Sequence, residues 1–291
     1  MDILTGKVLR VFNTLFEVAF PDILQPVICH KRKSAKSLFP GDRVVVEMDE
    51  QQAQIIEVLP RTNLIPHPRV ANVDRILYMV AAKEPQPDVW VIDQFLHYWQ
   101  MNGVPVTLIV NKTDLMDEVS ASLFEHYERL GVSALYLEAL RTSGKELLSV
   151  FTLIDHKTVM LAGQSGVGKS TLLRALVPES DALTGYVSKK NQRGRQTTKQ
   201  ASLHYCLQAS AQVVDTPGFS MVDPTGYTIR STQHFYGDVL KESTQCRFPN
   251  CRHIHEPDCA VKQSLERGEI FSFRYQNYLK TLGLLEKNQK W

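Results

Sequence analysis

The sequence predicts a chain of several domains: a small β-barrel, a central α/β domain and a mainly helical C-terminal domain. Its 291 residues exceed the length of one ordinary domain. Three patterns support this division: short alternating strands at the start, apolar strands interleaved with helical segments after Val70, and a cysteine cluster near the end. We therefore expect domains at residues 1–64, 65–222 and 223–291.

Composition narrows the class of protein. The net charge of +2 is close to zero, so the chain has no global basic character, and any basic surface must be local. The first residues carry no basic region followed by an apolar run, and no apolar stretch is long enough to cross a bilayer. We expect a cytoplasmic protein that has no membrane partner and is a monomer.

Five short candidate strands begin the chain, at residues 7–12, 15–20, 27–30, 43–48 and 54–59. They predict a small closed barrel of the oligonucleotide-binding (OB) fold. The basic run at residues 30–36 is expected in a connection of this barrel, either as a loop that faces nucleic acid or as an ordinary solvated loop. Residues 60–68 then form a break, because Pro66 and Pro68 disfavour both helix and strand interior.

The central segment alternates between apolar strands and helices. Buried strands are expected at residues 74–82, 105–110, 158–162 and 211–214, with a helix at residues 88–102. This alternation is typical of a mostly parallel sheet covered by helices.

A phosphate-binding loop follows the strand expected at residues 158–162. The segment from Gly163 to Ser170 has the pattern G-x-x-x-x-G-K-[ST] and stands directly before a helical segment. Backbone N–H groups and the helix start would surround the phosphates, Lys169 would neutralise them, and Ser170 would ligate magnesium. The nucleotide-binding residues expected here are Gly163, Gln164, Ser165, Gly166, Val167, Gly168, Lys169, Ser170 and Thr171.

A second motif selects the base. Asn111, Lys112, Thr113 and Asp114 form N-K-x-D where the strand expected at residues 105–110 ends. The Asp114 carboxylate can accept both the N1–H and the exocyclic amine of guanine, a donor pair that adenine lacks. Asn111 would bridge the base and the phosphate loop, and the stem of Lys112 would lie against the base. Together the two motifs predict a site for GTP and GDP.

A third motif and a polar loop complete the expected site. Asp215 to Gly218 match the D-x-x-G element, in which Asp215 would hold magnesium through water and the Gly218 N–H would sense the γ-phosphate. Residues 188–199 are either a switch loop or an ordinary surface loop. As a switch, the loop would ligate magnesium through Thr197 or Thr198 in the GTP state.

The order of these motifs is unusual. In a Ras-type domain the phosphate loop comes first, whereas here Asn111 precedes Gly163, and Asp215 comes last. This order predicts a circularly permuted α/β P-loop GTPase domain, because chain ends can move between surface loops without changing the core. The possible switch loop at residues 188–199 and the D-x-x-G element then lie close to the C-terminal domain in the sequence.

Three of the five cysteines lie within residues 246–259, together with two histidines. This clustering favours a metal site over a disulfide framework, and three thiolates with one imidazole suit a structural zinc ion. Spacing alone does not separate His253 from His255 as the fourth ligand, and unligated buried cysteines are the alternative. Cys29 and Cys206 lie in expected strands and are interpreted as small core residues.

On these motifs, the sequence resembles the bacterial RsgA (YjeQ/YloQ) family of circularly permuted GTPases over essentially its whole length. The barrel, the permuted motif order and the pattern Cys-x4-Cys-x-His-x5-Cys carry the resemblance. It implies a GTPase that acts in late maturation of the small ribosomal subunit, contacts ribosomal RNA and is stimulated by the subunit. It also implies zinc ligands at Cys246, Cys251, His253 and Cys259.

Two segments depart from the family pattern. A Ser-Ala or Thr-Ala pair usually supports guanine, but residues 137–140 are Leu-Glu-Ala-Leu, so only the backbone N–H of Ala139 is carried over. Gln196 replaces the usual switch histidine, and its amide can orient water without carrying a proton. The resulting catalytic residues are Lys169, Gln196, Thr197, Asp215 and Gly218, and the magnesium ligands are Ser170, Thr197, Thr198 and Asp215.

Phe219 follows the sensor glycine at the position where Ras-like proteins have the water-orienting glutamine. This predicts slow intrinsic turnover and a partner that completes the site. Two other classes of protein stay open. A small-molecule kinase would use the same phosphate loop without needing Asp114. An RNA-binding module with a vestigial nucleotide site would not need Lys169, Ser170 and Asp215 intact.

Overall fold

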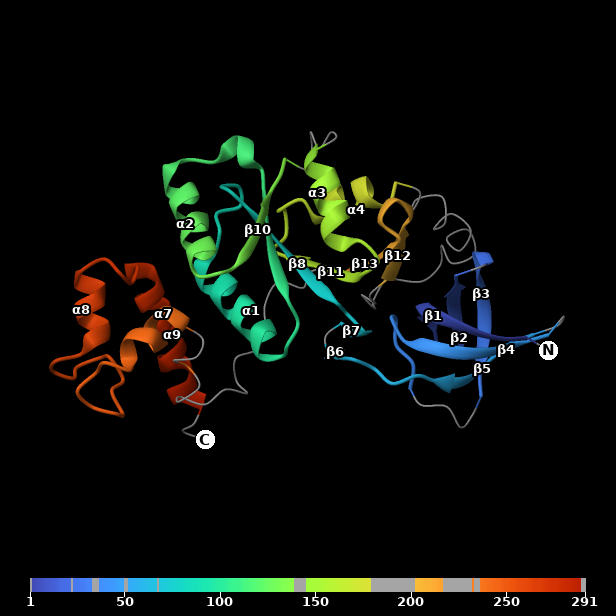
Figure 1. The fold of residues 1–291 in the computed structure, drawn as a ribbon, viewed down its shortest axis with the longest axis horizontal. Coiled ribbons are helices and arrows are strands. Elements are labelled where there is room, and N and C mark those ends of the chain that lie inside the picture. The colour runs from blue at the N-terminus through green and yellow to red at the C-terminus, as the bar shows by residue number, and fades with distance from the viewer. Residues whose placement is uncertain are drawn as a thin grey trace. The chain divides into compact units, whose positions relative to one another are not determined.

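The chain forms two compact units, each built from segments that are far apart in sequence (Figure 1). The computed structural model describes residues 2–21, 23–32, 37–49, 52–66, 68–138, 145–178, 202–216, 232 and 236–288. The first unit comprises Met1–Pro85, Val104–Met116 and Ala134–Phe219. The second comprises Gln86–Gly103, Asp117–Ser133 and Ser220–Trp291.

A closed five-stranded barrel begins the first unit and confirms the fold predicted for this segment. Its strands are β1 (Asp2–Phe12), β2 (Leu15–Phe20), β3 (Ile23–Lys31), β4 (Arg43–Met48) and β5 (Ala53–Val58). They pair in the order β1-β2-β3-β5-β4, antiparallel except between β3 and β5. Alternate side chains fill the barrel, so Val8, Val18 and Val46 are fully buried, and Cys29 is a core residue as expected.

Two features of the N-terminal region differ from expectation. His30 and Lys31 of the basic run belong to β3 rather than to a connection, and residues 33–36 lie outside the described part. The expected break contains a two-stranded sheet of β6 (Leu64–Pro66) and β7 (Arg69–Ala71). Pro66 is tolerated because it ends its strand in a sheet of only two strands, where a missing backbone donor disrupts no central ladder.

A six-stranded sheet forms the centre of the first unit, in the order β10-β9-β8-β11-β13-β12. Strand β8 runs parallel to β9 and β11, and β11 runs parallel to β13, so these carboxyl ends lie at one edge of the sheet. Strand β12 is antiparallel to β13. The strands are β8 (Arg75–Ala81), β9 (Val106–Asn111), β10 (Ser133–Tyr136), β11 (Thr158–Gly163), β12 (Ser202–Cys206) and β13 (Ala211–Asp215).

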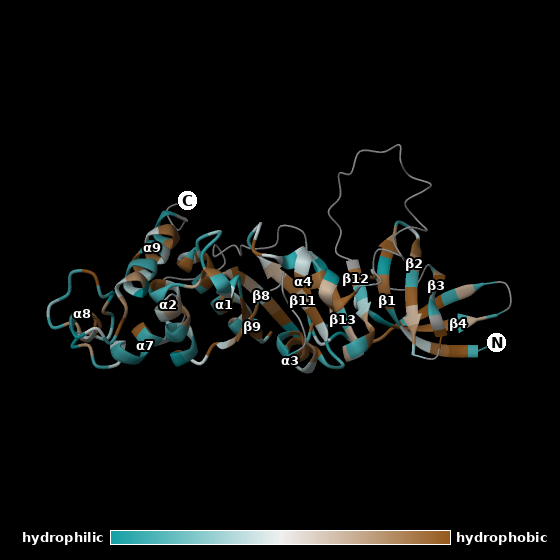
Figure 2. Cartoon of the chain, turned by 90° about the horizontal axis from the view of Figure 1, so that it is seen from above, coloured by the Kyte–Doolittle hydropathy of each residue, from teal (hydrophilic) through white to brown (hydrophobic). Residues whose placement is uncertain are grey.

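Two helices of the first unit, α3 (Lys145–Ile154) and α4 (Lys169–Leu176), pack on this sheet. Val150 of α3 and Leu172 of α4 share one hydrophobic cluster with Leu161 of β11 and with Cys206, which is again a core residue as expected. Figure 2 shows the strands of the sheet as largely hydrophobic. The short 3₁₀ turns are η1 (Thr113–Leu115) and η2 (Leu207–Ala209).

The second unit is helical. Its helices are α1 (Val89–Met101), α2 (Glu118–Arg129), α7 (Gly237–Ser243), α8 (Ala260–Glu266) and α9 (Ser272–Asn288). Helix α1 agrees with the predicted helix at residues 88–102, because Asp88 caps its start by accepting from the Val91 N–H at 3.1 Å. Asp117 and Ser120 form a capping box at the start of α2. Among the described residues, no helix is long and apolar enough to span a membrane.

Buried charges hold the helices of the second unit together. The Arg274 guanidinium of α9 donates to both carboxylate oxygens of Asp238, at 3.0 and 3.1 Å, and to the carboxylate of Asp93 in α1. Tyr127 and Asn277 each donate to Asp93 at 2.8 Å. Burial raises the pKa of Asp93, and Arg274 acts in the opposite direction. The network therefore joins α1, α2, α7 and α9 through one guanidinium.

Candidate functional site

Three predicted motifs gather at the carboxyl edge of the sheet. Asn111 ends β9, Gly163 ends β11, and Asp215 ends β13. Because these strands run in the same direction, residues from three distant parts of the sequence meet at one edge. This edge is the usual position of a ligand site in an open parallel sheet.

The phosphate loop has the backbone conformation that its glycines allow. Gly163 and Gly168 have φ values of +133° and +106°, which side chains with a Cβ rarely adopt. A Cβ on Gly163 would also lie 2.2 Å from the Met79 carbonyl oxygen. The Lys169 ammonium donates to the carbonyl oxygens of Gly163 and Gln164, each at 2.7 Å. Helix α4 starts at Lys169, so its free N–H groups face the loop.

Lys169 and Asp215 interact electrostatically at this edge. Burial lowers the pKa of Lys169, whereas the negative charge of Asp215 opposes that shift. Thr216 donates through its hydroxyl to the Leu161 carbonyl oxygen and so fixes the end of β13 beside β11. A lysine and a carboxylate that interact at one edge of the sheet suit a site that binds a phosphate together with a divalent cation.

Asn111 connects the base motif to the phosphate loop. Its side-chain amide is buried and donates to the Val167 carbonyl oxygen at 2.7 Å. A Cβ on Gly168 would lie 2.2 Å from the same amide nitrogen. The two motifs thus lie in direct contact, and a larger residue at either position would separate them.

The other residues of the base motif lie in η1 or directly before it. Lys112 has a φ of +59° and its ammonium donates to the Glu84 carbonyl oxygen. Thr113 donates through its hydroxyl to the Leu137 carbonyl oxygen at 3.5 Å. Asp114 lies in η1 and is exposed, so its carboxylate is accessible to a base.

Several predicted residues fall outside the part of the chain that the structure describes. They are Ala139, Gln196, Thr197, Thr198, Gly218 and Phe219. Of the predicted magnesium ligands, Ser170 and Asp215 are described, and Ser170 lies in the first turn of α4 directly after Lys169.

The structure brings the four predicted zinc ligands together in the second unit. The Sγ atoms of Cys246, Cys251 and Cys259 and a ring nitrogen of His253 lie within 4.8 Å of one another. His255 is exposed, so burial distinguishes the two histidines that spacing could not. The spacing of the two histidines gave no signal, because the conformation of the folded loop decides which of them is buried. In that loop His253 has a φ of +61°.

The spacing of these donor atoms fits a tetrahedral zinc ion. Zinc about 2.3 Å from sulfur and about 2.0 Å from nitrogen places two sulfurs roughly 3.8 Å apart, and a sulfur and a nitrogen roughly 3.5 Å apart. The Sγ atoms of Cys246 and Cys259 are 3.9 Å apart, and His253 Nδ1 lies 3.5 and 3.3 Å from them. The donor set and its dimensions therefore fit zinc.

Three residues that sequence reasoning missed hold this loop. The Glu256 carboxylate accepts from the backbone N–H groups of Arg252, Ile254 and His255 at 2.7 to 3.1 Å. Burial opposes its charge, but these donors lower the pKa of Glu256 to about 2. From α9, Tyr275 and Tyr278 donate to the backbone carbonyls of His253 and Arg252. These contacts orient the ligand loop in the way that outer-shell groups orient metal ligands.

Comparisons with known proteins find related GTPases. A family model of the RsgA GTPase matches residues 58–225, which is more than half of the chain. A protein of Ruminiclostridium cellulolyticum named small ribosomal subunit biogenesis GTPase RsgA is 38% identical over 251 residues, 85% of this chain and 81% of that protein.

Two solved structures are similar over almost the whole chain. The crystal structure of YjeQ from Thermotoga maritima superimposes with a TM-score of 0.76 and 29% identity, covering 98% of this chain and 99% of that one. The crystal structure of YloQ, a circularly permuted GTPase, gives a TM-score of 0.72 and 25% identity, with coverages of 98% and 96%. On the family match and the curated relatives, the chain belongs to the RsgA GTPase family.

Proposed function

We propose that this chain is a GTPase of small-ribosomal-subunit biogenesis that binds GTP with magnesium and hydrolyses it to GDP and phosphate. The hydrogen bond from Asn111 to the Val167 carbonyl is the observation that carries this proposal. It joins a guanine-reading motif to a phosphate loop, so one nucleotide can contact both. A small-molecule kinase would not need this connection.

The residues that the structure describes bind the nucleotide and stabilise the negative charge on its phosphates. Backbone N–H groups of residues 163–170 hold the phosphates, and the Lys169 ammonium moves from the loop carbonyls to the β and γ phosphates when nucleotide enters. Ser170 and Asp215, with Thr197 or Thr198, would hold magnesium, which neutralises charge on the phosphate oxygens when bound. Asp114 selects guanine through its two acceptor oxygens.

Hydrolysis requires a water molecule aligned with the γ-phosphate. Gln196 orients this water through its amide, and Gly218 contacts the γ-phosphate through its N–H. Phe219 cannot orient water, since a phenyl ring has no hydrogen-bonding group. The intrinsic rate is therefore low, and docking on the small subunit raises it by completing the catalytic site.

The remaining parts have supporting roles in this proposal. The barrel at residues 1–64 contacts ribosomal RNA, the GTPase domain spans residues 65–222, and residues 223–291 form a C-terminal domain with one structural zinc ion. Cys246, Cys251, His253 and Cys259 hold that ion. The protein acts as a monomer in the cytoplasm, where its subunit partner is assembled.

Single-turnover hydrolysis of GTP tests the proposal, measured alone, with purified small subunits and with purified large subunits. We expect small subunits to raise the rate at least about tenfold, as partner-completed GTPase sites do, and large subunits to leave it unchanged. The Lys169→Ala variant should lose hydrolysis under all three conditions. Equal rates with and without small subunits would remove the subunit from the mechanism, and equal competition by ATP would favour a kinase.

A further inference from the structure

A short segment of the first unit contacts both nucleotide-binding motifs although it belongs to neither. Residues 82–85 follow β8 directly, and the Ala82 N–H donates to the Asn111 carbonyl oxygen at 2.8 Å. This bond continues the parallel pairing of β8 with β9, in which Ala81 lies opposite Asn111. We call residues 82–85 the β8 extension. Its backbone therefore starts at the same edge of the sheet as the two motifs.

The β8 extension holds the far end of the Lys112 side chain. The Lys112 ammonium donates to the carbonyl oxygen of Glu84. At the near end of this side chain, the Lys112 backbone has a φ of +59°, a left-handed conformation that few residues other than glycine adopt. The stem of Lys112 is therefore held at both ends, and contacts within the protein set its direction.

The same extension also reaches the phosphate loop. A Cβ placed on Gly166 would lie 3.8 Å from the Cδ atom of Pro85, which is an ordinary van der Waals distance. Gly166 itself is exposed and has a φ of +82°. Two consecutive residues, Glu84 and Pro85, thus lie beside the N-K-x-D motif and beside the phosphate loop, respectively.

A lysine stem that packs against a base must give up rotamer freedom. Lysine has many rotamers, so this loss of entropy is among the largest of any side chain. A stem whose ammonium is already hydrogen-bonded has lost much of that freedom before a nucleotide arrives. The bond to Glu84 therefore lowers the entropy cost that remains at the moment of binding, and it raises the affinity for the base.

We propose that the carbonyl group of Glu84 is a positioning group of the nucleotide site. It holds the Lys112 stem in the direction in which the stem packs against guanine, and it does so already in the nucleotide-free protein. The β8 extension thereby preorganises the base site through its backbone. The inference rests on the proposed function, since it adds a positioning segment to the GTP site.

Titration calorimetry with GDP tests the contribution of this hydrogen bond. In Lys112→Met the side chain keeps a flexible apolar stem of similar length but has no donor at its end. The dissociation constant for GDP should rise roughly three- to tenfold, which is the range that one net hydrogen bond accounts for. Equal affinity of Lys112→Met and the unaltered protein would overturn the inference.

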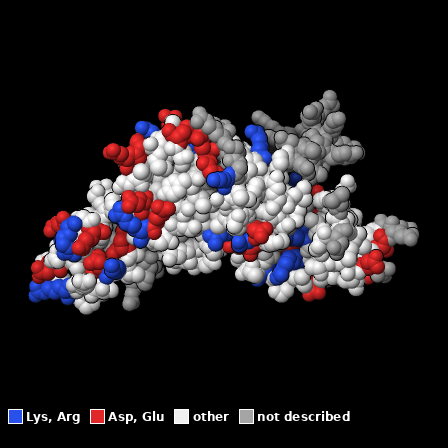
Figure 3. Space-filling view, turned by 45° about the horizontal axis from the view of Figure 1, so that its top comes forward, with Lys and Arg blue, Asp and Glu red and all other residues white. Residues whose placement is uncertain are grey.

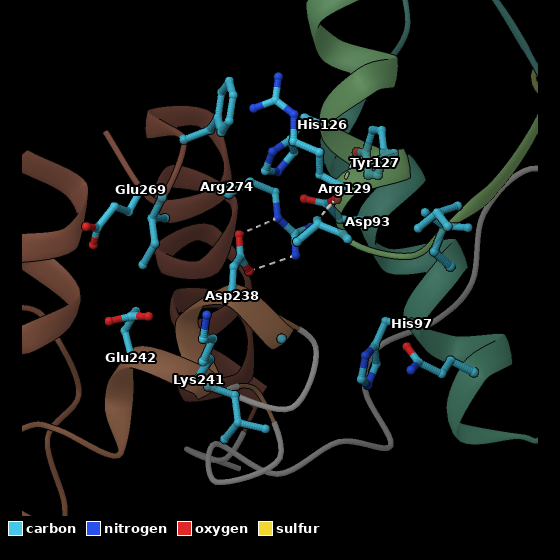
Figure 4. Close-up of a pocket in the computed structure, with 18 of the residues that line it drawn as sticks. Asp93, His97, His126, Tyr127, Arg129, Asp238, Lys241, Glu242, Glu269 and Arg274 are labelled. Carbon is cyan, nitrogen blue, oxygen red and sulfur yellow. Dashed lines mark hydrogen bonds and ion pairs between the residues drawn. The ribbon is translucent and has the colours of Figure 1, made fainter. Parts of the chain in front are cut away.

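A second lysine controls for the lost charge. Lys241 of α7 is exposed, and no hydrogen bond or ion pair joins it to the other residues drawn in Figure 4. Acidic and basic side chains are interspersed on the face drawn in Figure 3, so each variant removes one charge among many of both signs. Lys241→Met should bind GDP as tightly as the unaltered protein.

The salt dependence separates the anchored stem from a simple attraction between Lys112 and the phosphates. The ratio of the Lys112→Met dissociation constant to that of the unaltered protein should stay constant between about 0.1 and about 0.5 M salt. A ratio that falls towards one as salt is added would show that Lys112 acts as a screened charge, and it would overturn the inference.

A variant of the extension tests the acceptor. One glycine inserted between Lys83 and Glu84 displaces the Glu84 carbonyl and should itself weaken GDP binding. In this background Lys112→Met should weaken binding no further, because the bond is already lost and the two changes act on one interaction. A second loss of the same size would show that Lys112 acts without Glu84, which contradicts the proposal.

NMR relaxation of the lysine side chains, measured without nucleotide, reads the positioning directly. The Lys112 side chain should be ordered, whereas that of Lys241 should move freely on the nanosecond timescale. Equal mobility of the two side chains would overturn the inference even if GDP binds. Failure of the unaltered protein to bind GDP would instead contradict the proposed function, and the order of Lys112 could still be measured.

Discussion

The side-chain amide of Asn111 donates a 2.7 Å hydrogen bond to the carbonyl oxygen of Val167, across 56 residues of sequence. Asn111 ends β9 and Val167 lies in the phosphate loop after β11, with β8 between these strands. The bond is buried, so its loss leaves a carbonyl without a partner. It therefore fixes the distance between the N-K-x-D motif and the G-x-x-x-x-G-K-[ST] loop.

Asn111→Ala should weaken GDP binding. The loss of one buried hydrogen bond is worth about 1–2 kcal/mol, which corresponds to roughly 5- to 30-fold in the dissociation constant. Titration calorimetry with GDP measures this. Asn102→Ala is the control, because Asn102 also donates to a backbone carbonyl, that of Tyr98 at 2.6 Å, but is exposed and outside the site. Equal affinity of the Asn111→Ala variant and the unaltered protein would mean that the bond does not organise the loop.

Cys251→Ala should abolish stoichiometric zinc binding and loosen the second unit, because a structural zinc ion stabilises the fold that binds it. Metal analysis gives the zinc content, and the fluorescence of Trp90 and Trp99 in α1 follows the packing of the same unit. Cys29→Ala is the matched control, since Cys29 is equally buried but lies in the barrel core. Full zinc content in the Cys251→Ala variant would exclude this ligand set.

Arg274→Met should destabilise the second unit by about 3–5 kcal/mol, because it leaves Asp93 and Asp238 buried without their cation. Denaturant unfolding followed by tryptophan fluorescence measures the change. Arg267→Met removes an exposed guanidinium from its pair with Glu269 and should leave unfolding unchanged. Similar stability of the two variants would show that the buried network contributes no more than a surface ion pair.

The burial of Lys7 predicts that the stability of the first unit depends on pH. It donates to the Thr158 hydroxyl at 2.6 Å, and burial lowers its pKa from 10.5 to about 8, against the attraction of Asp74. Between pH 8 and 10.5 the unfolded chain binds the proton more strongly than the folded chain, so stability rises with pH in this window. Below pH 8 Lys7 is charged in both the folded and the unfolded chain, so the folded chain bears the full free-energy cost of burying that charge.

Lys7→Met should therefore stabilise the first unit at pH 7, by about 1–2 kcal/mol once the lost hydrogen bond is subtracted. The difference between variant and parent should shrink as pH rises from 8 to 10.5. Denaturant unfolding followed by circular dichroism at several pH values checks this, and NMR of the lysine side chains reads the pKa of Lys7 directly. A titration midpoint near 10.5 would contradict the prediction.

Local sequence signals predicted the elements that local chemistry determines. Helix α1 follows from Asp88 as cap and the apolar residues after it, and the phosphate loop follows from glycines whose positive φ few other residues tolerate. The barrel follows from residues that alternate between core and solvent. The contact between Asn111 and Val167 follows from the parallel strands, because both motifs come directly at or after strand ends that lie at one edge of the sheet.

The remaining features depend on tertiary contacts, which the periodic pattern of apolar residues in a sequence does not reveal. Glu256 was missed because its three backbone donors meet only when the zinc loop is folded. Arg274 was missed because its partners Asp93 and Asp238 lie far away in sequence. Strand β6 was missed because Pro66 disfavours strand interiors, and only the short pairing with β7 makes it acceptable.

The base specificity of Asp114 tests the central claim most directly. Xanthine keeps the N1–H of guanine but carries an oxygen in place of the amine, so an amide side chain complements it where a carboxylate does not. Calorimetry should show the unaltered protein binding GDP more tightly than xanthosine diphosphate by at least about tenfold, and Asp114→Asn reversing that preference. Equal preference in the two proteins would contradict a guanine site at the carboxyl edge of this sheet.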